Sequence, residues 1–182
     1  MNAPADGVLV AGVGNVFLGD DGFGVEVVRR LTHHQLPPYV EVVDSGVRGV
    51  HLAYQLLDGY RTVVLVDATA RGAEPGTVYL IDASAPAAVE PRQTQLDGHH
   101  MSPDAVLALL DTLRQSIGGS APGRVLVVGC EPACVDEGIG LSAPVAAAVD
   151  EAVRLVLRVV RDEEPLTVTV ADSNYPERNP QP

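Results

Sequence analysis

The chain alternates apolar runs of strand length with stretches that repeat on a helical period. The first apolar run, residues 8–11, stops at two glycines, and a 3.6-residue apolar period then begins at Phe23. This pattern is typical of a strand, a loop and a helix that ends near His33. Similar apolar runs predict strands at 40–43, 62–66, 77–81 and 124–129, and helical periods predict helices at 51–57, 103–117 and from 143 onward.

The order of these elements predicts an α/β protein. Strand and helix alternate from residue 8 to residue 66, and the run 62–66 is apolar throughout, as in strands buried on both faces of a parallel sheet. We therefore expect a three-layer α-β-α fold around a twisted, mostly parallel, five-stranded sheet. Residues 1–162 should form one domain, whereas residues 163–182 are acidic and then rich in Pro and Asn, and should be disordered.

Local signals mark where several elements begin and end. Asp44-Ser45-Gly46 predicts a short turn after the second strand, and the aperiodic residues 82–98 predict a long surface loop. Ser102 followed by Pro103 is a good start for a helix, which Gly118 and Gly119 should end. Ser142 should cap the last helix.

The loop after the first strand contains Gly12 and Gly14 and then two adjacent acids, Asp20 and Asp21. A dinucleotide-binding loop requires a third glycine where this chain has Phe17, and the acids would repel a phosphate. A P-loop is excluded because the chain has no lysine. One of the acids should have a structural role, such as capping the helix, which leaves the other for chemistry. The spacing alone does not decide which.

Composition narrows the kinds of partner and location. The chain has 24 acidic residues and 12 arginines, which give it a formal charge of −12. This charge disfavours nucleic acid or an anionic membrane as a partner and favours a protein with a cationic patch. No apolar run is long enough to cross a bilayer and no signal peptide is evident, so we expect a cytoplasmic protein. We also expect a monomer. Cys130 and Cys134 fit neither a redox pair nor a zinc pair, and we expect reduced, non-catalytic thiols.

Three groups far apart in sequence should meet at the carboxyl ends of the strands, where open α/β sheets bind their ligands. They are Asp21 after the first strand, Asp67 at the end of the third, and His99 in the long loop. Two carboxylates and an imidazole suit a divalent transition metal and leave coordination positions open. His100 competes with His99 for this role, whereas His33, His34 and His51 should be surface residues.

The chain resembles the hydrogenase maturation endopeptidases over nearly its whole length. Its first loop fits the signature G-x-G-N-x-x-x-x-D-[DE]-x-x-G, through Gly12, Gly14, Asn15, Asp20, Asp21 and Gly24. Other matching segments are Asp44-Ser45-Gly46, Val66-Asp67-Ala68, His99-x-Met101-Ser102-Pro103, Gly129-Cys130-Glu131-Pro132 and Gly138-Ile139-Gly140-Leu141-Ser142. Some members carry Glu where this chain has Asp21.

The resemblance implies a function. Such enzymes remove a short C-terminal extension from the precursor of the large subunit of nickel-iron hydrogenase after nickel has been inserted. On this resemblance, Asp21, Asp67 and His99 would contact nickel that the substrate brings, and the protease would hold no permanent cofactor. We expect an aspartyl-type endopeptidase in which a metal-polarised carbonyl and water, or a carboxylate base such as Asp20 or Asp44, drives hydrolysis.

Two other classes stay open at this stage. A conventional metallohydrolase would hold its own divalent metal, and a non-catalytic module would use the Gly12-Gly14 loop to bind a nucleotide. Acyl-enzyme chemistry is disfavoured because no serine lies in a Gly-x-Ser-x-Gly segment.

Overall fold

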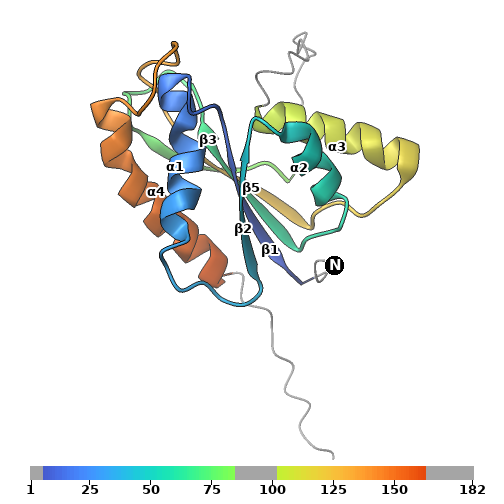
Figure 1. Ribbon diagram of the computed structural model, residues 1–182. Coiled ribbons are helices and arrows are strands. Elements are labelled where there is room, and N and C mark those ends of the chain that lie inside the picture. Colours follow the sequence, from blue (N-terminus) through green and yellow to red (C-terminus); the bar gives the residue numbers. More distant parts are fainter. Residues whose placement is uncertain (1–5, 85–101, 163–182) are drawn as a thin grey trace, which may run out of the picture.

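The computed structural model describes residues 6–84 and 102–162, which form alternating strands and helices (Figure 1). The strands are β1 (Val8–Val13), β2 (Val40–Gly46), β3 (Thr62–Ala68), β4 (Val78–Asp82) and β5 (Arg124–Cys130). The helices are α1 (Phe23–Leu31), α2 (Gly49–Leu56), α3 (Pro103–Ile117) and α4 (Ala143–Asp162), and a 3₁₀ turn, η1 (Gly19–Gly22), precedes α1.

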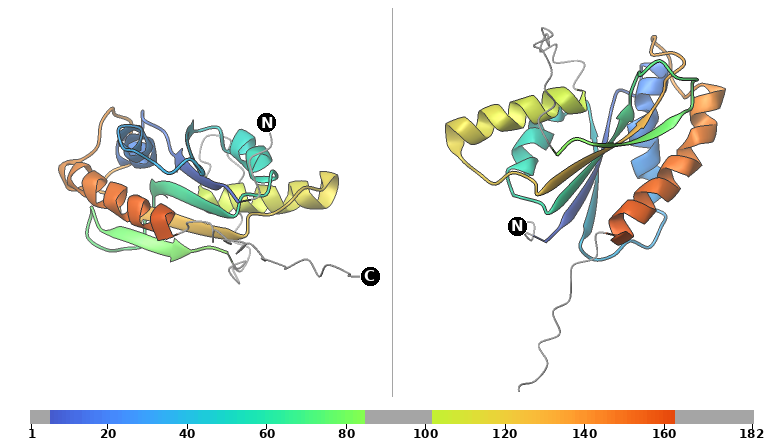
Figure 2. Two further views of the ribbon diagram at one scale, coloured as in Figure 1. Left: turned by 90° about the horizontal axis from the view of Figure 1, so that it is seen from below. Right: turned by 180° about the vertical axis from the view of Figure 1, so that it is seen from behind.

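The five strands form one twisted sheet between two layers of helices. The strand order is β2-β1-β3-β5-β4, and every pair is parallel except β4 with β5, which is antiparallel. Helices α1 and α4 lie side by side on one face, while α2 and α3 cover the other (Figures 1 and 2). The expected three-layer α/β fold with a mostly parallel five-stranded sheet is confirmed.

Alternate side chains of the central strands fill two separate cores, because successive residues of a strand point to opposite faces. Val8 and Val10 of β1 pack with α1 and α4, whereas Leu9 and Ala11 pack with α2 and α3. The apolar run that predicted β3 is buried along its whole length. On α4, the valines at 145, 149, 153, 156 and 160 are all buried, as the helical period predicted.

Helix α1 packs unusually close to the sheet because it carries Gly24. A Cβ atom at that position would lie 2.1 Å from the carbonyl oxygen of Val66 and 2.3 Å from that of Val13. Across the contact, a Cβ at Gly12 would lie 2.4 Å from the carbonyl oxygen of Gly24. The two glycines therefore let the helix rest directly on the backbone of β1 and β3.

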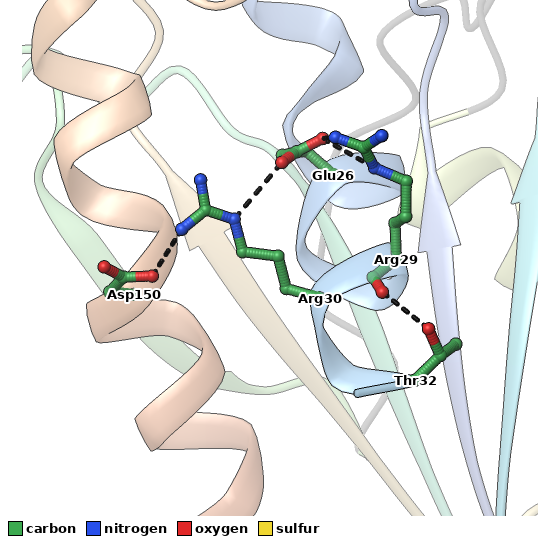
Figure 3. A network of polar contacts seen from close by, with 5 residues as sticks. All are labelled: Glu26, Arg29, Arg30, Thr32 and Asp150. Carbon is green, nitrogen blue, oxygen red and sulfur yellow. Dashed lines mark hydrogen bonds and ion pairs between the residues drawn. The ribbon is translucent and has the colours of Figure 1, made fainter. Parts of the chain in front are cut away.

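Polar contacts on the outer side connect the two helices of this layer. Figure 3 shows Glu26 accepting hydrogen bonds from Arg29 and Arg30, while Arg30 also reaches Asp150 of α4 at 2.5 Å. These side chains are partly or largely exposed, so each ion pair contributes at most about 1 kcal/mol to stability. The buried apolar side chains, and not these pairs, hold α1 against α4.

One sequence prediction about local structure is wrong. Asp44-Ser45-Gly46 does not form a turn after β2 but belongs to the strand, which runs on to Gly46. A register shift between Gly12 and Val13 lets the two strands stay paired, and the Gly14 amide donates to the carbonyl of Gly46 at 3.1 Å. Strand β2 therefore extends alongside the loop that follows β1.

Other element ends agree with the sequence within a few residues. The Oγ of Ser102 accepts the Ala105 amide at the start of α3, and the helix ends at Gly118 as expected. The expected loop is described only to Ser84, and the expected tail from residue 163 lies outside the described residues, so its disorder stays a prediction. Within 6–84 and 102–162, no helix has the length and apolarity to span a membrane.

Candidate active site at the carboxyl edge of the sheet

Asp21 lies in the η1 turn, just beyond the carboxyl end of β1. Its Oδ2 accepts the backbone amide of Asn15 at 2.7 Å, and the Asn15 side chain in turn accepts the Phe17 amide at 3.0 Å. These bonds fold the loop back on itself and leave Asp21 half-buried. A hydrogen bond within its own loop therefore holds the carboxylate of Asp21 at the edge of the sheet.

Asp67 lies near the carboxyl end of β3 and is only 5% exposed. Burial raises the pKa of this carboxyl well above its ordinary value, and the nearby charges of Asp21 and Asp104 raise it further. The amide of Ala68 donates to Asp67 and opposes part of this effect. Asp67 is thus a buried acid whose ionised form has too few compensating partners within the described residues.

Gly14 brings the two acids to one place. Its φ of 128° lies in the region that favours glycine. A Cβ atom at Gly14 would lie 1.8 Å from the carbonyl oxygen of Asp21 and 3.7 Å from Oδ1 of Asp67. Without a side chain at this position, the loop carrying Asp21 can fold down beside the end of β3.

The third residue predicted for this site, His99, lies outside the described residues, as does its competitor His100. Of the residues around the site, α3 contributes Asp104 in its first turn, close enough to Asp67 to affect its pKa. Among residues 6–84 and 102–162, no three His, Cys, Asp or Glu side chains form a group that could hold a metal ion. Of the three predicted site residues, the structure therefore describes only Asp21 and Asp67.

Asp20, the neighbour of Asp21, has a structural role. Its side chain is fully buried and accepts four hydrogen bonds: from the amides of Ala133, Cys134 and Ser142 and from the Ser142 hydroxyl, at 2.6–2.9 Å. Burial alone would raise the pKa of Asp20, but these bonds outweigh it and hold the pKa below 3.8. Asp20 therefore fastens the loop before α4 to the loop after β1.

The expectation that one acid of the pair caps the first helix is wrong. Neither η1 nor α1 has a side-chain cap, because the residues preceding them are Leu18 and Gly22. Asp20 instead reaches the start of a different helix, α4, where Ser142 donates to it. The structural partner of Asp20 is thus far away in sequence, which is why the helix-cap interpretation missed it.

The site can bind a cation or hold a proton. Two adjacent carboxylates, one of them buried, repel each other when both are ionised, and a cation between them would relieve that repulsion. Without a cation, the raised pKa of Asp67 favours a protonated carboxyl that can exchange a proton with a reacting group.

Comparison with known proteins assigns the chain to a family. A sequence model described as hydrogenase maturation protease matches residues 25–159, well over half of the 182-residue chain. The chain belongs to the hydrogenase maturation protease family. It is therefore a hydrolase that cleaves peptide bonds in the maturation of hydrogenases.

Relatives and solved structures agree with this assignment. The protease is 35% identical over 158 residues to a Methanocaldococcus jannaschii protein named for hydrogenase maturation, a match covering 85% of this chain and 96% of the relative. It superposes on the hydrogenase maturating endopeptidase HybD from Escherichia coli with a TM-score of 0.68 and 29% identity, covering 87% and 94% of the two chains. The hydrogenase 2 maturation peptidase of a Thaumarchaeota archaeon gives 0.61 and 32%, covering 85% and 97%.

Asp44, the other carboxylate considered as a base, is an exposed residue of β2 in this protease. Its backbone pairs in register with Gly12, and its backbone carbonyl accepts a hydrogen bond from Arg48. These contacts use the backbone of Asp44 and not its carboxylate. Asp44 therefore remains available at the same edge of the sheet.

Glu131 is a third buried acid among the described residues, and the sequence analysis did not predict a structural role for it. Its carboxylate accepts the Tyr79 hydroxyl at 2.7 Å and the amides of Arg71 and Gly72, and these bonds lower its pKa. Glu131 thereby fastens the connection between β3 and β4, directly after Asp67. The sequence around Glu131 did not indicate this role, because the hydrogen-bond partners of Glu131 lie more than fifty residues away.

The surroundings of Cys130 disfavour the thiolate form that a nucleophile needs. Burial, with the charges of Asp20 and Glu131, raises the pKa of its thiol to about 11. Both cysteines are free, Cys130 buried and Cys134 exposed. The two unpaired cysteines agree with the expectation of reduced thiols.

Proposed function

We propose that this protease removes the C-terminal extension of the nickel-iron hydrogenase large-subunit precursor after nickel insertion, and that it recognises nickel carried by that precursor. The observation that carries the proposal is the pair Asp21 and Asp67: the backbone of Asp21 and Oδ1 of Asp67 both lie beside Gly14, and the charge of Asp21 raises the pKa of Asp67. A metal brought by the substrate would compensate the charge that burial makes costly at Asp67.

His99 completes the proposed nickel contacts. Two carboxylates alone are a weak set for nickel, whereas an imidazole is a preferred ligand of that metal. Residue 99 lies three positions before Ser102, which starts α3, and the first turn of α3 lies near Asp67. Since three residues span at most about 11 Å, the length of the chain between His99 and α3 allows this contact.

Nickel is part of the substrate in this proposal, and the protease carries no permanent metal. An incomplete set of protein ligands favours this, because such a set binds a free ion weakly until the precursor supplies the remaining ligands. Cleavage then depends on completed metal insertion. We place the reaction in the cytoplasm, where two free cysteines are usual.

Water must still be activated for hydrolysis, and the structure removes one candidate for that role. The four hydrogen bonds that Asp20 accepts from the loop before α4, and its lowered pKa, argue against Asp20 as the base. Asp44 remains as a carboxylate base, and polarisation of the scissile carbonyl by the substrate's nickel is the other route.

Nickel recognition is tested with two forms of the precursor. Purified protease is incubated with nickel-loaded and nickel-free large-subunit precursor, and the loss of mass of the large subunit is followed by mass spectrometry. We expect the nickel-loaded form alone to be shortened. Equal cleavage of both forms would contradict metal recognition, and stoichiometric divalent metal in the purified protease would instead favour a conventional metallohydrolase.

The roles of the two acids are tested by substitution. Asp21→Asn and Asp67→Asn should each lower the rate of processing at least about a hundredfold, because both metal contact and proton exchange need a carboxylate. Asp111→Asn, on the exposed side of α3, is the matched control and should process normally. Normal processing by both site variants, with an unchanged fold by circular dichroism, would show that other groups carry the reaction.

The nucleotide-binding alternative is not supported by the loop geometry. The space beside Gly12 is filled by Gly24 and Val28 of α1, and the space beside Gly14 by the backbone of Asp21. The glycines therefore accommodate the chain itself, and no backbone cradle is left for a phosphate.

A further inference from the structure

Two loops beside the candidate active site are joined into one rigid unit. We call them the paired loops: residues 15–22 after β1 and residues 132–142 before α4. The Gly138 amide donates to the carbonyl of Phe17, and the Gly138 carbonyl accepts the Gly19 amide, both at 2.9 Å. The buried Asp20 adds its four hydrogen bonds to the second loop. In Figure 1 this second loop arches over the start of α1.

Large apolar side chains are exposed on the paired loops. Phe17 is 64% exposed and Ile139 is 85% exposed, with Val16 and Val135 also exposed. Phe17 and Ile139 are brought together because Gly138, next to Ile139, bonds directly to Phe17. Apolar side chains held in water on an ordered backbone form a surface suited to binding another chain.

The charge of the paired loops is one-sided. Neither loop contains a basic residue, whereas Asp136 and Glu137 are exposed beside Val135 and Ile139. An apolar surface with an acidic rim is complementary to large apolar side chains flanked by Lys or Arg. A second copy of this chain would bring the same acidic rim against itself and be repelled.

The first of the paired loops also carries Asp21, so the exposed apolar residues lie near the site. Val16 follows Asn15, whose amide binds Asp21, and a Cβ at Gly22 would lie 3.2 Å from the Cα of Val16. A polypeptide lying across Phe17 and Ile139 would therefore pass within a few residues of Asp21. Such a chain would be positioned before any contact with the two carboxylates is made.

We propose that the paired loops are the docking surface for a segment of the precursor polypeptide that presents large apolar side chains flanked by Lys or Arg. This inference rests on the proposed function, since it takes the precursor as the substrate. The surface adds binding energy at a distance from the cleaved bond and aligns the precursor with Asp21 and Asp67. Phe17 and Ile139 supply the apolar contact, and Asp136 and Glu137 supply the charge.

The test separates binding from catalysis. Processing of nickel-loaded precursor is measured over a range of precursor concentrations for Phe17→Ser, Ile139→Ser and wild type. Each substitution should raise KM at least about tenfold while kcat changes less than about threefold, because the apolar contact lies outside the reacting centre. Phe17→Leu, which keeps an apolar side chain, should restore KM to within about threefold of wild type.

Two further variants sharpen the result. Ile117→Ser is the matched control, because Ile117 is also 64% exposed but lies at the far end of α3, and its KM should be unchanged. The double variant Asp136→Asn, Glu137→Gln keeps the apolar surface and should raise KM by several-fold at low salt. The measurement on this double variant does not depend on whether the serine variants fold normally.

The outcomes that overturn the proposal differ from those that overturn the proposed function. Normal KM in Phe17→Ser and Ile139→Ser, or an equal rise in Ile117→Ser, contradicts docking while leaving processing intact. A wild-type dimer that Phe17→Ser dissociates would assign the surface to a second copy and also contradict it. If wild-type protease shortens neither form of the precursor, the proposed function fails and the docking surface with it.

Discussion

At the scale of single residues, two adjacent aspartates take opposite roles. Asp20 is buried, fully hydrogen-bonded and has a lowered pKa, whereas Asp21 lies at the sheet edge beside Asp67, whose pKa is raised. The difference arises from which backbone amides each carboxylate can reach. Ionisation of Asp20 stabilises the fold, whereas ionisation of the buried Asp67 opposes it.

Replacement of Asp20 should destabilise the protein. An asparagine offers one acceptor oxygen where the carboxylate now accepts four hydrogen bonds, so Asp20→Asn should cost roughly 2–4 kcal/mol at pH 7. Because the folded pKa of Asp20 lies below 3.8, the difference should persist above pH 3.8 and shrink as the pH falls through the folded value. Urea unfolding at pH 7 and pH 3 measures it. An equally stable variant would contradict the anchoring role.

Replacement of Asp67 should have the opposite effect on stability. Its folded pKa is raised above 3.8, so the cost of ionising Asp67 is absent below that pH and reduces stability as the pH rises through the raised value. Asp67→Asn does not ionise and should be more stable than wild type at pH 7 and equal to it near pH 3. Thermal midpoints in buffer with a chelator measure this difference, since bound metal would mask it. A less stable variant at pH 7 would contradict the assignment.

At the scale of elements, the site depends on how closely α1 rests on the sheet. Gly24 and Gly12 remove the side chains that would separate the helix from β1 and β3, and Gly14 lets the following loop reach the end of β3. The same helix begins directly after η1, which carries Asp21. A shift of α1 away from the sheet would therefore carry Asp21 away from Asp67.

Gly24→Ala tests this packing. The added methyl group would overlap the carbonyl oxygens of Val66 and Val13, so α1 must move and the variant should lose at least about 2 kcal/mol of stability. Processing should fall as well, because Asp21 moves with the helix. Gly138→Ala is the control for stability, since its Cβ would meet only the Asp136 carbonyl oxygen, at 4.0 Å. Equal urea midpoints for the two variants would contradict the close-packing argument.

At the scale of the whole molecule, the protease is strongly acidic, and its two candidate site acids lie at one edge of a single sheet. The net charge of −12 acts over the distance of a Debye length, well beyond the contacts of the site. Such a charge favours approach of a cationic region of the precursor and disfavours like-charged partners.

The association step should therefore depend on salt. We expect kcat/KM for the nickel-loaded precursor to fall several-fold as ionic strength rises from about 0.05 to 0.3 M, because the charge is screened. The value of kcat at saturating precursor should change less than about twofold, which separates association from chemistry. An unchanged kcat/KM across this range would show that the acidic surface does not guide the precursor.

The sequence by itself determined the class of the fold and the edge of the sheet at which the two candidate acids lie. Apolar periodicity is a local signal, and it placed the strands, the helices and the ends of the strands that carry Asp21 and Asp67. The loop signature also indicated the family. These features follow from neighbouring residues, which the sequence displays directly.

Only the tertiary structure decided which acid of the pair is structural and how far β2 extends. The partners of Asp20 lie 113 to 122 positions away, and Gly46 stays in its strand because it pairs with Val13 across a shifted register. Glu131 likewise binds residues more than fifty positions before it. Hydrogen bonds between distant segments leave no periodic trace in a sequence, so their assignment required the folded chain.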